Sequence, residues 1–216
     1  VPPPPHLLAE LLSAMEHAIH DEDTTPPIVR AGLLHVQFET IHPYLDGNGR
    51  IGRLLVSLLL EHWGLLREPL LYLSLFFKRH RSEYYERLGA VRTHGDWEGW
   101  VDFFLDGVTT IANEVVDSAR NLFTLLTEDR RRLLASESMS IAAMRLFELL
   151  PRRPIVTTAA VVAGLGVSKP TAGRALEALE AVGILVEVTG KKRDRTWAYR
   201  EYLDRLQVGT ELDEPR

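Results

Sequence analysis

The chain has 216 residues, of which 45% are hydrophobic, so it can form one large domain or two small domains with a buried core. Its formal net charge of −5 excludes a uniformly basic nucleic-acid-binding protein, although it is compatible with a local basic patch. The lack of cysteine excludes disulfides, thiolate metal sites and a cysteine nucleophile, and it fits the reducing cytoplasm in which we expect the protein to work. No apolar run has the length of a membrane-spanning helix, so we expect no membrane association.

The first segment, "VPPPPHLLAELLSAMEHAIH", starts as extended polyproline and continues as a helix. Its apolar residues recur at helical spacing: Leu8, Leu11, Leu12, Met15 and Ile19. Because the segment opens so abruptly, we expect natural sequence before Val1. The next predicted helix places Leu34, Phe38 and Ile41 on one face and ends at Pro43.

The rest of the first two-thirds of the chain is also predicted to be helical. Residues 51–64 are apolar on nearly every side, which predicts a central buried helix with Gly64 at its C-terminal end. Residues 68–96 predict a short helix, a basic break and another helix, and residues 97–135 continue as a helix that becomes more charged towards its end. No period-two pattern typical of a strand occurs before Ala135.

Towards the C-terminus the pattern changes to that of a second, compact domain. A helix ends before Pro151, a second short helix starts at Thr157 or Thr158, and Ser168 caps a third helix that has Pro170 in its first turn. The segments "ILVEV" and "TWAYR" predict two strands joined by the basic tip "TGKKRD". A helix-turn-helix followed by a hairpin is the order of a winged helix.

The predicted fold class is therefore mostly α. We expect a helical core over residues 1–135, a winged-helix domain of helices and a small β-hairpin over 136–205, and a tail over 206–216. The third helix and the tip of the hairpin offer cations that could meet DNA phosphates: Lys169, Arg174, Lys191, Lys192, Arg193 and Arg195. DNA binding is thus an alternative function, and the rival interpretation is a solvated hairpin on a domain that packs against a partner subunit.

One stretch concentrates residues suited to phosphate chemistry: "HPYLDGNGRIGR", from His42 to Arg53. His42 follows a helix and carries an imidazole, the usual general base near neutral pH. Asp46 can hold a hard cation such as Mg²⁺ through oxygen. The backbone N–H groups around the "GNG" turn can point into one concavity at the start of the next helix, which makes an anion hole.

Two arginines complete the pattern of this stretch. Arg50 and Arg53 are three residues apart, so they share a helix face, and their guanidinium groups match phosphate oxygens. Alone, each residue would be read as an ordinary turn or a solvated side chain, but together they favour phosphoryl or nucleotidyl transfer. A zinc site is an alternative, because His35, Glu39 and His42 share a helix face, although it explains neither the glycines nor the arginines.

The same stretch resembles the signature of the Fic family, His-Pro-Phe-x-Asp/Glu-Gly-Asn-Gly-Arg-x-x-Arg. It differs at one fixed position, where Tyr44 stands for phenylalanine. The segments "PPPPHLLAELLSAMEHAIH", "LLHVQFETIHPYLDGNGR", "LYLSLFFKRHRSEYYERL" and "GDWEGWVDFFLDGV" also resemble the helical Fic core. The C-terminal winged helix is similar to that of many longer bacterial members.

This resemblance implies an enzyme that transfers AMP from ATP to a hydroxyl of a target protein. His42 would deprotonate a Ser, Thr or Tyr of the target, and Asp46 would bind Mg²⁺ at the phosphates. Tyr84 matches a tyrosine that lines the adenine pocket, and Arg92 falls near the same pocket. The implied ATP-binding residues are Asp46, Gly47, Asn48, Gly49, Arg50, Ile51, Gly52, Arg53, Tyr84 and Arg92.

The resemblance also bears on the type of reaction and its control. The Doc-like kinase branch has Ala and Lys where this chain has Gly47 and Gly49, which favours AMP transfer over phosphorylation. The reverse reaction, de-AMPylation, is an alternative at the same site. Many Fic proteins also have an inhibitory helix and a hairpin flap for the target, and we expect both before Val1. Homodimers are usual among similar sequences.

Overall fold

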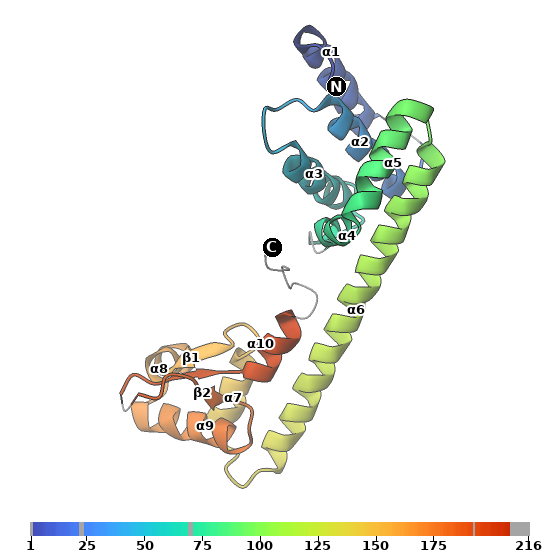
Figure 1. The fold of residues 1–216 in the computed structure, drawn as a ribbon. Helices are drawn as coiled ribbons and strands as arrows, with labels where there is room; N and C mark the ends of the chain where they lie inside the picture. Colours follow the sequence, from blue (N-terminus) through green and yellow to red (C-terminus); the bar gives the residue numbers. More distant parts are fainter. Residues whose placement is uncertain (1, 22–23, 69–70, 192, 208–216) are drawn as a thin grey trace. The chain divides into compact units, whose positions relative to one another are not determined.

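The computed structural model describes residues 2–21, 24–68, 71–191 and 193–207 (Figure 1). Its backbone forms two compact units, Val1–Val115 and Val116–Arg216, which we call unit 1 and unit 2. The division falls inside one long helix, α6 (Trp97–Ala135). None of the helices in the described part of the chain is both long and apolar enough to cross a membrane.

Unit 1 is helical, as predicted. Before α6 its described residues form η1 (Pro5–Leu7), α1 (Leu8–His20), α2 (Pro27–Ile41), α3 (Asn48–His62), α4 (Leu73–Arg79) and α5 (Arg81–His94). The predicted apolar face of α2 is confirmed, because Leu34, Phe38 and Ile41 are buried with Met15 of α1. The predicted basic break is a single residue, His80, between α4 and α5.

An aromatic cluster fills the second part of the core of unit 1. The ring centroids of Phe77 and Tyr84 lie 4.8 Å apart, and Trp100 packs beside both rings. The indole Nε1 of Trp100 donates to the carbonyl oxygen of Gly32 at 3.0 Å. A Cβ on Gly32 would lie 2.8 Å from the Phe104 ring, so glycine at this position lets α2 pack directly on α6.

The prediction that the helix after the glycine-rich stretch is buried on all sides is wrong. α3 buries Val56, Leu59 and Leu60, whereas Leu54 and Leu58 are 57% and 50% exposed. The buried residues lie at the spacing of one helix face, and that face packs on the core. Composition alone could not distinguish a helix covered on every side from a helix covered on one.

Unit 2 contains the second half of α6 and a small mixed domain. Its further elements are α7 (Ile141–Leu149), β1 (Ile155–Thr157), α8 (Thr158–Leu165), α9 (Lys169–Ala181), β2 (Val186–Glu187), β3 (Thr196–Ala198) and α10 (Arg200–Gln207). The three strands form an antiparallel sheet in the order β1-β3-β2, in which Val156 and Glu187 both pair with Trp197. The first strand was not predicted. The mostly α fold class is confirmed, whereas the winged-helix assignment of this domain stays a prediction.

The helices of unit 2 have regular side-chain caps. The hydroxyls of Ser140, Thr157 and Ser168 accept the N–H groups three residues further on, as expected for the starts of α7, α8 and α9. The core of the unit includes Leu125 and Leu133 of α6. The second half of α6 therefore packs with unit 2, whereas the sequence placed the domain boundary at the end of that helix.

Candidate active site

His42 ends α2 in an unusual backbone conformation. Its φ of 50° and ψ of 57° lie in the left-handed region, which a non-glycine residue rarely adopts. Its N–H donates to the carbonyl oxygen of Phe38 at 2.9 Å, and Pro43 follows directly. Strained residues of this kind cost about 1–3 kcal/mol and cluster at functional sites. The conformation leaves the imidazole exposed at the end of the helix, where a general base is expected.

The loop after His42 is closed by the side chain of Asn48. Its Oδ1 accepts from the N–H of Tyr44 at 2.9 Å, and its Nδ2 donates to the carbonyl oxygen of the same residue at 2.6 Å. Asn48 is 2% exposed, so this clamp is buried. Gly47 completes the turn with a φ of 86°. The amide of Asn48 thus holds the loop, and only backbone N–H groups remain to bind an anion at this point.

α3 starts directly after this loop, and it starts without a side-chain cap. Its N-cap is Gly47, which has no side chain to accept a hydrogen bond from the first turn. The first N–H groups of a helix have no partner within the helix, and they carry the positive end of its dipole. An uncapped helix start is a ready site for a phosphate group. The uncapped start of α3 is thus compatible with the predicted anion hole, which stays a prediction.

The charged residues of the motif lie around this helix start. Arg50 and Asp46 form an exposed ion pair at 3.1 Å. Arg53 is half-buried, and its Nη1 lies 3.1 Å from the position that a Cβ would take on Gly49. Because glycine carries no Cβ, the guanidinium of Arg53 can lie close to the backbone of the helix start. Ile51 points outward and is 38% exposed.

Gly52 connects this helix start to a buried polar group on α2. Its carbonyl oxygen accepts from Nδ1 of His35 at 2.9 Å, and Nε2 of His35 accepts from the hydroxyl of Tyr84 at 2.9 Å. Burial of the His35 ring lowers its pKa to about 4, so the ring is neutral and matches this donor and acceptor pattern. Burial likewise raises the pKa of Tyr84. Tyr84 is 4% exposed, so its ring belongs to the core of the unit.

Glu39 is the buried charge beneath the site, and sequence reasoning gave it no role in phosphate binding. Its side chain faces Gly52, where a Cβ would lie 2.6 Å from its Oε1, and this oxygen has no hydrogen-bond partner in the described residues. Burial raises the pKa of Glu39, and the charges of His42, Arg53 and Arg92 partly oppose this effect. The sequence did hold a signal that could have identified Glu39 as part of the site: a glutamate within an apolar helix face.

Arg92 reaches the site from α5. Its Nη2 donates to the carbonyl oxygen of Glu39 at 2.9 Å, and its Nε donates to Oγ1 of Thr40 at 3.4 Å. These contacts attach α5 to the last turn of α2, beside the strained His42. The structure thus places Arg92 against the end of α2, just before the motif, although the two segments are far apart in the sequence.

The zinc alternative does not fit the geometry. Both ring nitrogens of His35 are occupied by Gly52 and Tyr84, so this histidine has no lone pair for a metal. No group of three metal-binding side chains occurs among the described residues. A Mg²⁺ ion needs fewer protein ligands, because it is usually held by one or two carboxylates together with substrate phosphates. Asp46 fits that role, since its carboxylate is almost fully exposed beside the helix start.

The predicted cations of unit 2 lie on two separate elements. Lys169 and Arg174 are exposed on α9, and Lys191, Arg193 and Arg195 are exposed between β2 and β3. The Nε of Arg195 donates to the carbonyl oxygen of Lys191 at 3.0 Å. Lys192 lies outside the described residues.

Comparison with known proteins identifies the segment that carries the strained histidine. Residues 1–60, which include the whole stretch from His42 to Arg53, match the model of the Fic/DOC family. The candidate site described above, with its uncapped helix start and its two arginines, therefore lies in the matched segment, which we call the Fic segment.

Relatives of the Fic segment have been named for an activity. A protein from Drosophila grimshawi named protein adenylyltransferase Fic is 37% identical over 108 residues, which are 49% of this chain and 21% of the relative. A probable protein adenylyltransferase from Aquifex aeolicus is 38% identical over 65 residues, which are 30% of this chain and 20% of the relative. The chain thus spans about a fifth of the length of these curated relatives.

A solved structure extends the likeness of fold beyond the Fic segment. The crystal structure of a Fic family protein from Desulfovibrio desulfuricans G20 matches with a TM-score of 0.53 over 91% of this chain and 56% of that chain. The sequence identity is 21%, so this comparison concerns the fold alone.

Proposed function

We propose that the protein is a Mg²⁺-dependent adenylyltransferase that transfers AMP from ATP to a serine, threonine or tyrosine hydroxyl of a target protein. The observation that carries this proposal is the position of His42, in a strained conformation, one short loop before the uncapped start of α3. The names of the Drosophila and Aquifex relatives support the same reaction. A cytoplasmic location, which the lack of cysteine fits, is part of the proposal.

In this reaction His42 takes the proton from the target hydroxyl. The hydroxyl oxygen then forms a bond to the α-phosphorus of ATP, and the bond from that phosphorus to the bridging oxygen of pyrophosphate breaks. The N–H groups at the start of α3 bind the phosphate oxygens, and the guanidinium of Arg53 binds the leaving pyrophosphate. The target keeps AMP as a phosphodiester, and the proton leaves from the imidazole.

Asp46 would hold Mg²⁺, which neutralises charge on the phosphates when it is bound. The carboxylate of Asp46 is paired with Arg50 at 3.1 Å. When ATP binds, the phosphates can take over Arg50 while the carboxylate of Asp46 turns to the cation. Both side chains are exposed, so this exchange of partners requires no change in the core.

The test uses ATP labelled at the α or at the γ phosphate, the purified chain and a cell lysate as a source of targets. We expect label from the α phosphate on protein, and loss of labelling by about 10²–10⁴-fold in His42→Ala, because the general base is removed. His62→Ala is the matched control, since His62 is an exposed histidine at the other end of α3.

Each contrary result has a defined meaning. Label from the γ phosphate alone would identify a kinase. Equal labelling by the wild type and His42→Ala would refute the role of His42. Release of AMP from targets that were modified beforehand, without any forward transfer, would identify a de-AMPylase.

A further inference from the structure

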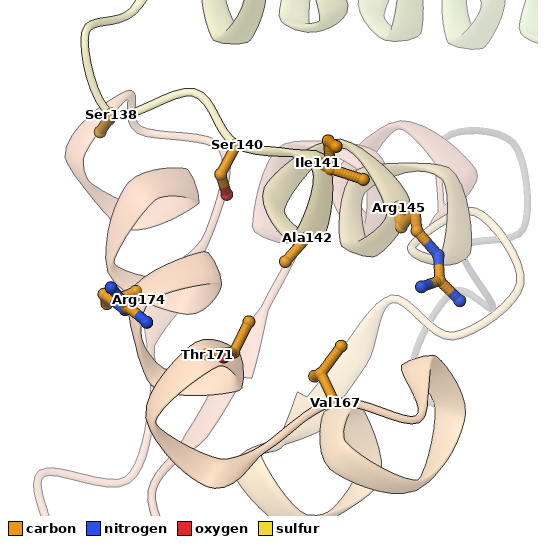
Figure 2. Close-up of a pocket in the computed structure, with 8 residues that line it drawn as sticks. All are labelled: Ser138, Ser140, Ile141, Ala142, Arg145, Val167, Thr171 and Arg174. Atoms are coloured by element: carbon orange, nitrogen blue, oxygen red, sulfur yellow. The ribbon is translucent and has the colours of Figure 1, made fainter.

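Unit 2 has a groove of about 490 Å³ between the start of α7 and the start of α9. Ser140, Ile141 and Arg145 line one side of it, and Val167, Thr171 and Arg174 line the other. Figure 2 shows Arg145 and Arg174 at opposite ends of the groove, with Thr171 and Val167 between them. No lining residue has a carboxylate, so the groove is cationic.

The two arginines of this groove have no partner in the described part of the chain. No hydrogen bond or ion pair involves the guanidinium of Arg145 or Arg174, whereas Arg132 and Arg205 in the same unit are each paired with an acidic residue. The hydroxyl of Ser140 already accepts the N–H of Ala143 as a helix cap. The guanidinium groups are therefore the main groups left to bind an anion.

The fold favours a long polyanion over a small anion. α8, the turn and α9 form a helix-turn-helix, and its second helix presents Lys169 and Arg174 outward near its start. Between them lie Pro170 and Gly173, and the space around a Cβ on Gly173 is open. A phosphate backbone can approach this surface closely.

The hairpin after α9 adds separate cations to the same unit. Lys191, Arg193 and Arg195 are exposed between β2 and β3. The carboxylate of Glu187 accepts from the N–H groups of Thr189 and Gly190, and these bonds fix the start of the hairpin turn. Cations spread over a helix and a hairpin match repeated phosphates better than they match one ligand of limited size.

We propose that unit 2 binds the backbone of duplex DNA, with Arg145 and Arg174 on separate phosphates and the start of α9 in the major groove. Arg145 is a contact that sequence reasoning did not identify, because it lies on the helix before the helix-turn-helix. The outward side chains beyond Arg174 are Glu177 and Glu180, which repel phosphates. The binding therefore has little sequence preference, since few side chains can read base edges. This proposal is independent of the AMP transfer reaction.

The test is the fluorescence anisotropy of a labelled DNA duplex of about 20 base pairs, or two helical turns, titrated with the full chain. We expect the affinity to fall as salt rises from about 50 to 200 mM, because bound phosphates release counterions. Arg145→Gln and Arg174→Gln each weaken binding several-fold on unrelated sequences and reduce the slope of log affinity against log salt by about 1.

The matched control is Arg153→Gln. Arg153 is exposed in the same unit and precedes β1, whose Ile155 pairs with Ala198 at the end of β3 away from the hairpin tip. This variant should bind DNA like the wild type. Thermal melting of all three variants establishes that they fold alike.

Three outcomes would overturn the proposal. One is no binding of the duplex at the lowest salt. Another is a loss of affinity in Arg153→Gln equal to that in Arg145→Gln, which would mean that only net charge matters. The third is equal binding of duplex RNA, whose major groove is too narrow for a helix. Equal DNA binding by His42→Ala is expected, because the groove does not belong to the Fic site.

Discussion

Each unit of the protein has a buried carboxylate, and the two differ in their hydrogen-bond partners. Asp129 of unit 2 is fully buried, accepts from the hydroxyl of Tyr199 at 2.6 Å and pairs with Arg132. Glu39 of unit 1 is 7% exposed, and its Oε1 has no hydrogen-bond partner among the described residues. Buried polar groups are normally satisfied, so Asp129 follows the rule and Glu39 departs from it.

The same difference appears at the helix starts. α7, α8 and α9 of unit 2 begin with a serine or threonine that caps the first turn, whereas α3 begins at Gly47 with no side-chain cap. His42 is strained next to that uncapped start. The helices α1, α2, α4 and α5 of unit 1 also start without a side-chain cap. The strained His42 and the unsatisfied Glu39 are therefore what distinguish the point where we place the chemistry. In unit 2 the buried carboxylate is satisfied and α7, α8 and α9 are capped. The DNA that we propose as its ligand would contact long side chains on the surface.

The largest expected effect concerns two glycines in helices, one in each unit. Gly52→Ala should destabilise the protein by about 1–3 kcal/mol, because the added methyl group would lie 2.6 Å from Glu39 Oε1 and 3.1 Å from the Phe38 ring. Gly173→Ala is the control: its Cβ meets open space, so it should stabilise the protein by about 0.5–1 kcal/mol. Urea unfolding measures both, and equal effects would contradict the close approach of α2 and α3.

The next largest expected effect concerns Asp129, the buried carboxylate that has hydrogen-bond partners. Tyr199→Phe removes the hydroxyl that donates to Asp129, so the free energy of unfolding should fall by about 1–2 kcal/mol. The loss is limited because Arg132 still contacts the carboxylate. Tyr85→Phe, at an exposed tyrosine of unit 1, should change stability by less than about 0.5 kcal/mol. If Tyr199→Phe leaves the free energy of unfolding unchanged, the stability of the buried Asp129 carboxylate does not depend on this hydroxyl.

The smallest expected effect concerns Glu39. Its substitution should raise the stability of the protein, whereas Gly52→Ala and Tyr199→Phe lower it. Burial raises the pKa of Glu39, so between its ordinary value and this raised value the folded state keeps a proton that the unfolded state has lost. Stability therefore falls as pH rises through that window, and the full penalty is present above it. Glu39→Gln should stabilise the protein by about 1 kcal/mol at neutral pH, and this gain should vanish below the ordinary pKa of glutamate.

The pH series is what separates titration from packing. Glu128→Gln, at an exposed glutamate of unit 2, is the matched control for the loss of a carboxylate. A gain from Glu39→Gln that is the same at every pH would show that the side chain acts through shape alone. The two outcomes can be measured with the same unfolding curves.

The sequence predicted the helices and the motif, because both depend on residues close together in the chain. The face of α2 that contains Leu34 and Phe38 follows from spacing, and the caps Thr157 and Ser168 follow from local chemistry. The strand β1 was missed because it has only three residues and is defined by its pairing with β3, which lies far along the chain. Local periodicity cannot report such a partner.

The candidate site was predicted in its residues but not in their contacts. The motif identified Asn48, but not that its side chain would clamp Tyr44, since the loop could have folded around a different hydrogen bond. Glu39 was considered only as a zinc ligand, because its distance from Gly52 and Arg53 depends on how α2 packs on α3. The structure supplies this packing, and with it the buried charge beneath the helix start.

The clamp of Asn48 on Tyr44 has a consequence for nucleotide binding. The two hydrogen bonds close five residues, Tyr44 to Asn48, into a small ring that the protein's own groups hold together. A loop that is already ordered loses little conformational entropy when a phosphate docks, so more of the contact energy appears as affinity. The entropy of fixing this loop is a cost of folding, so under the proposed function ATP would bind to a loop that is already ordered.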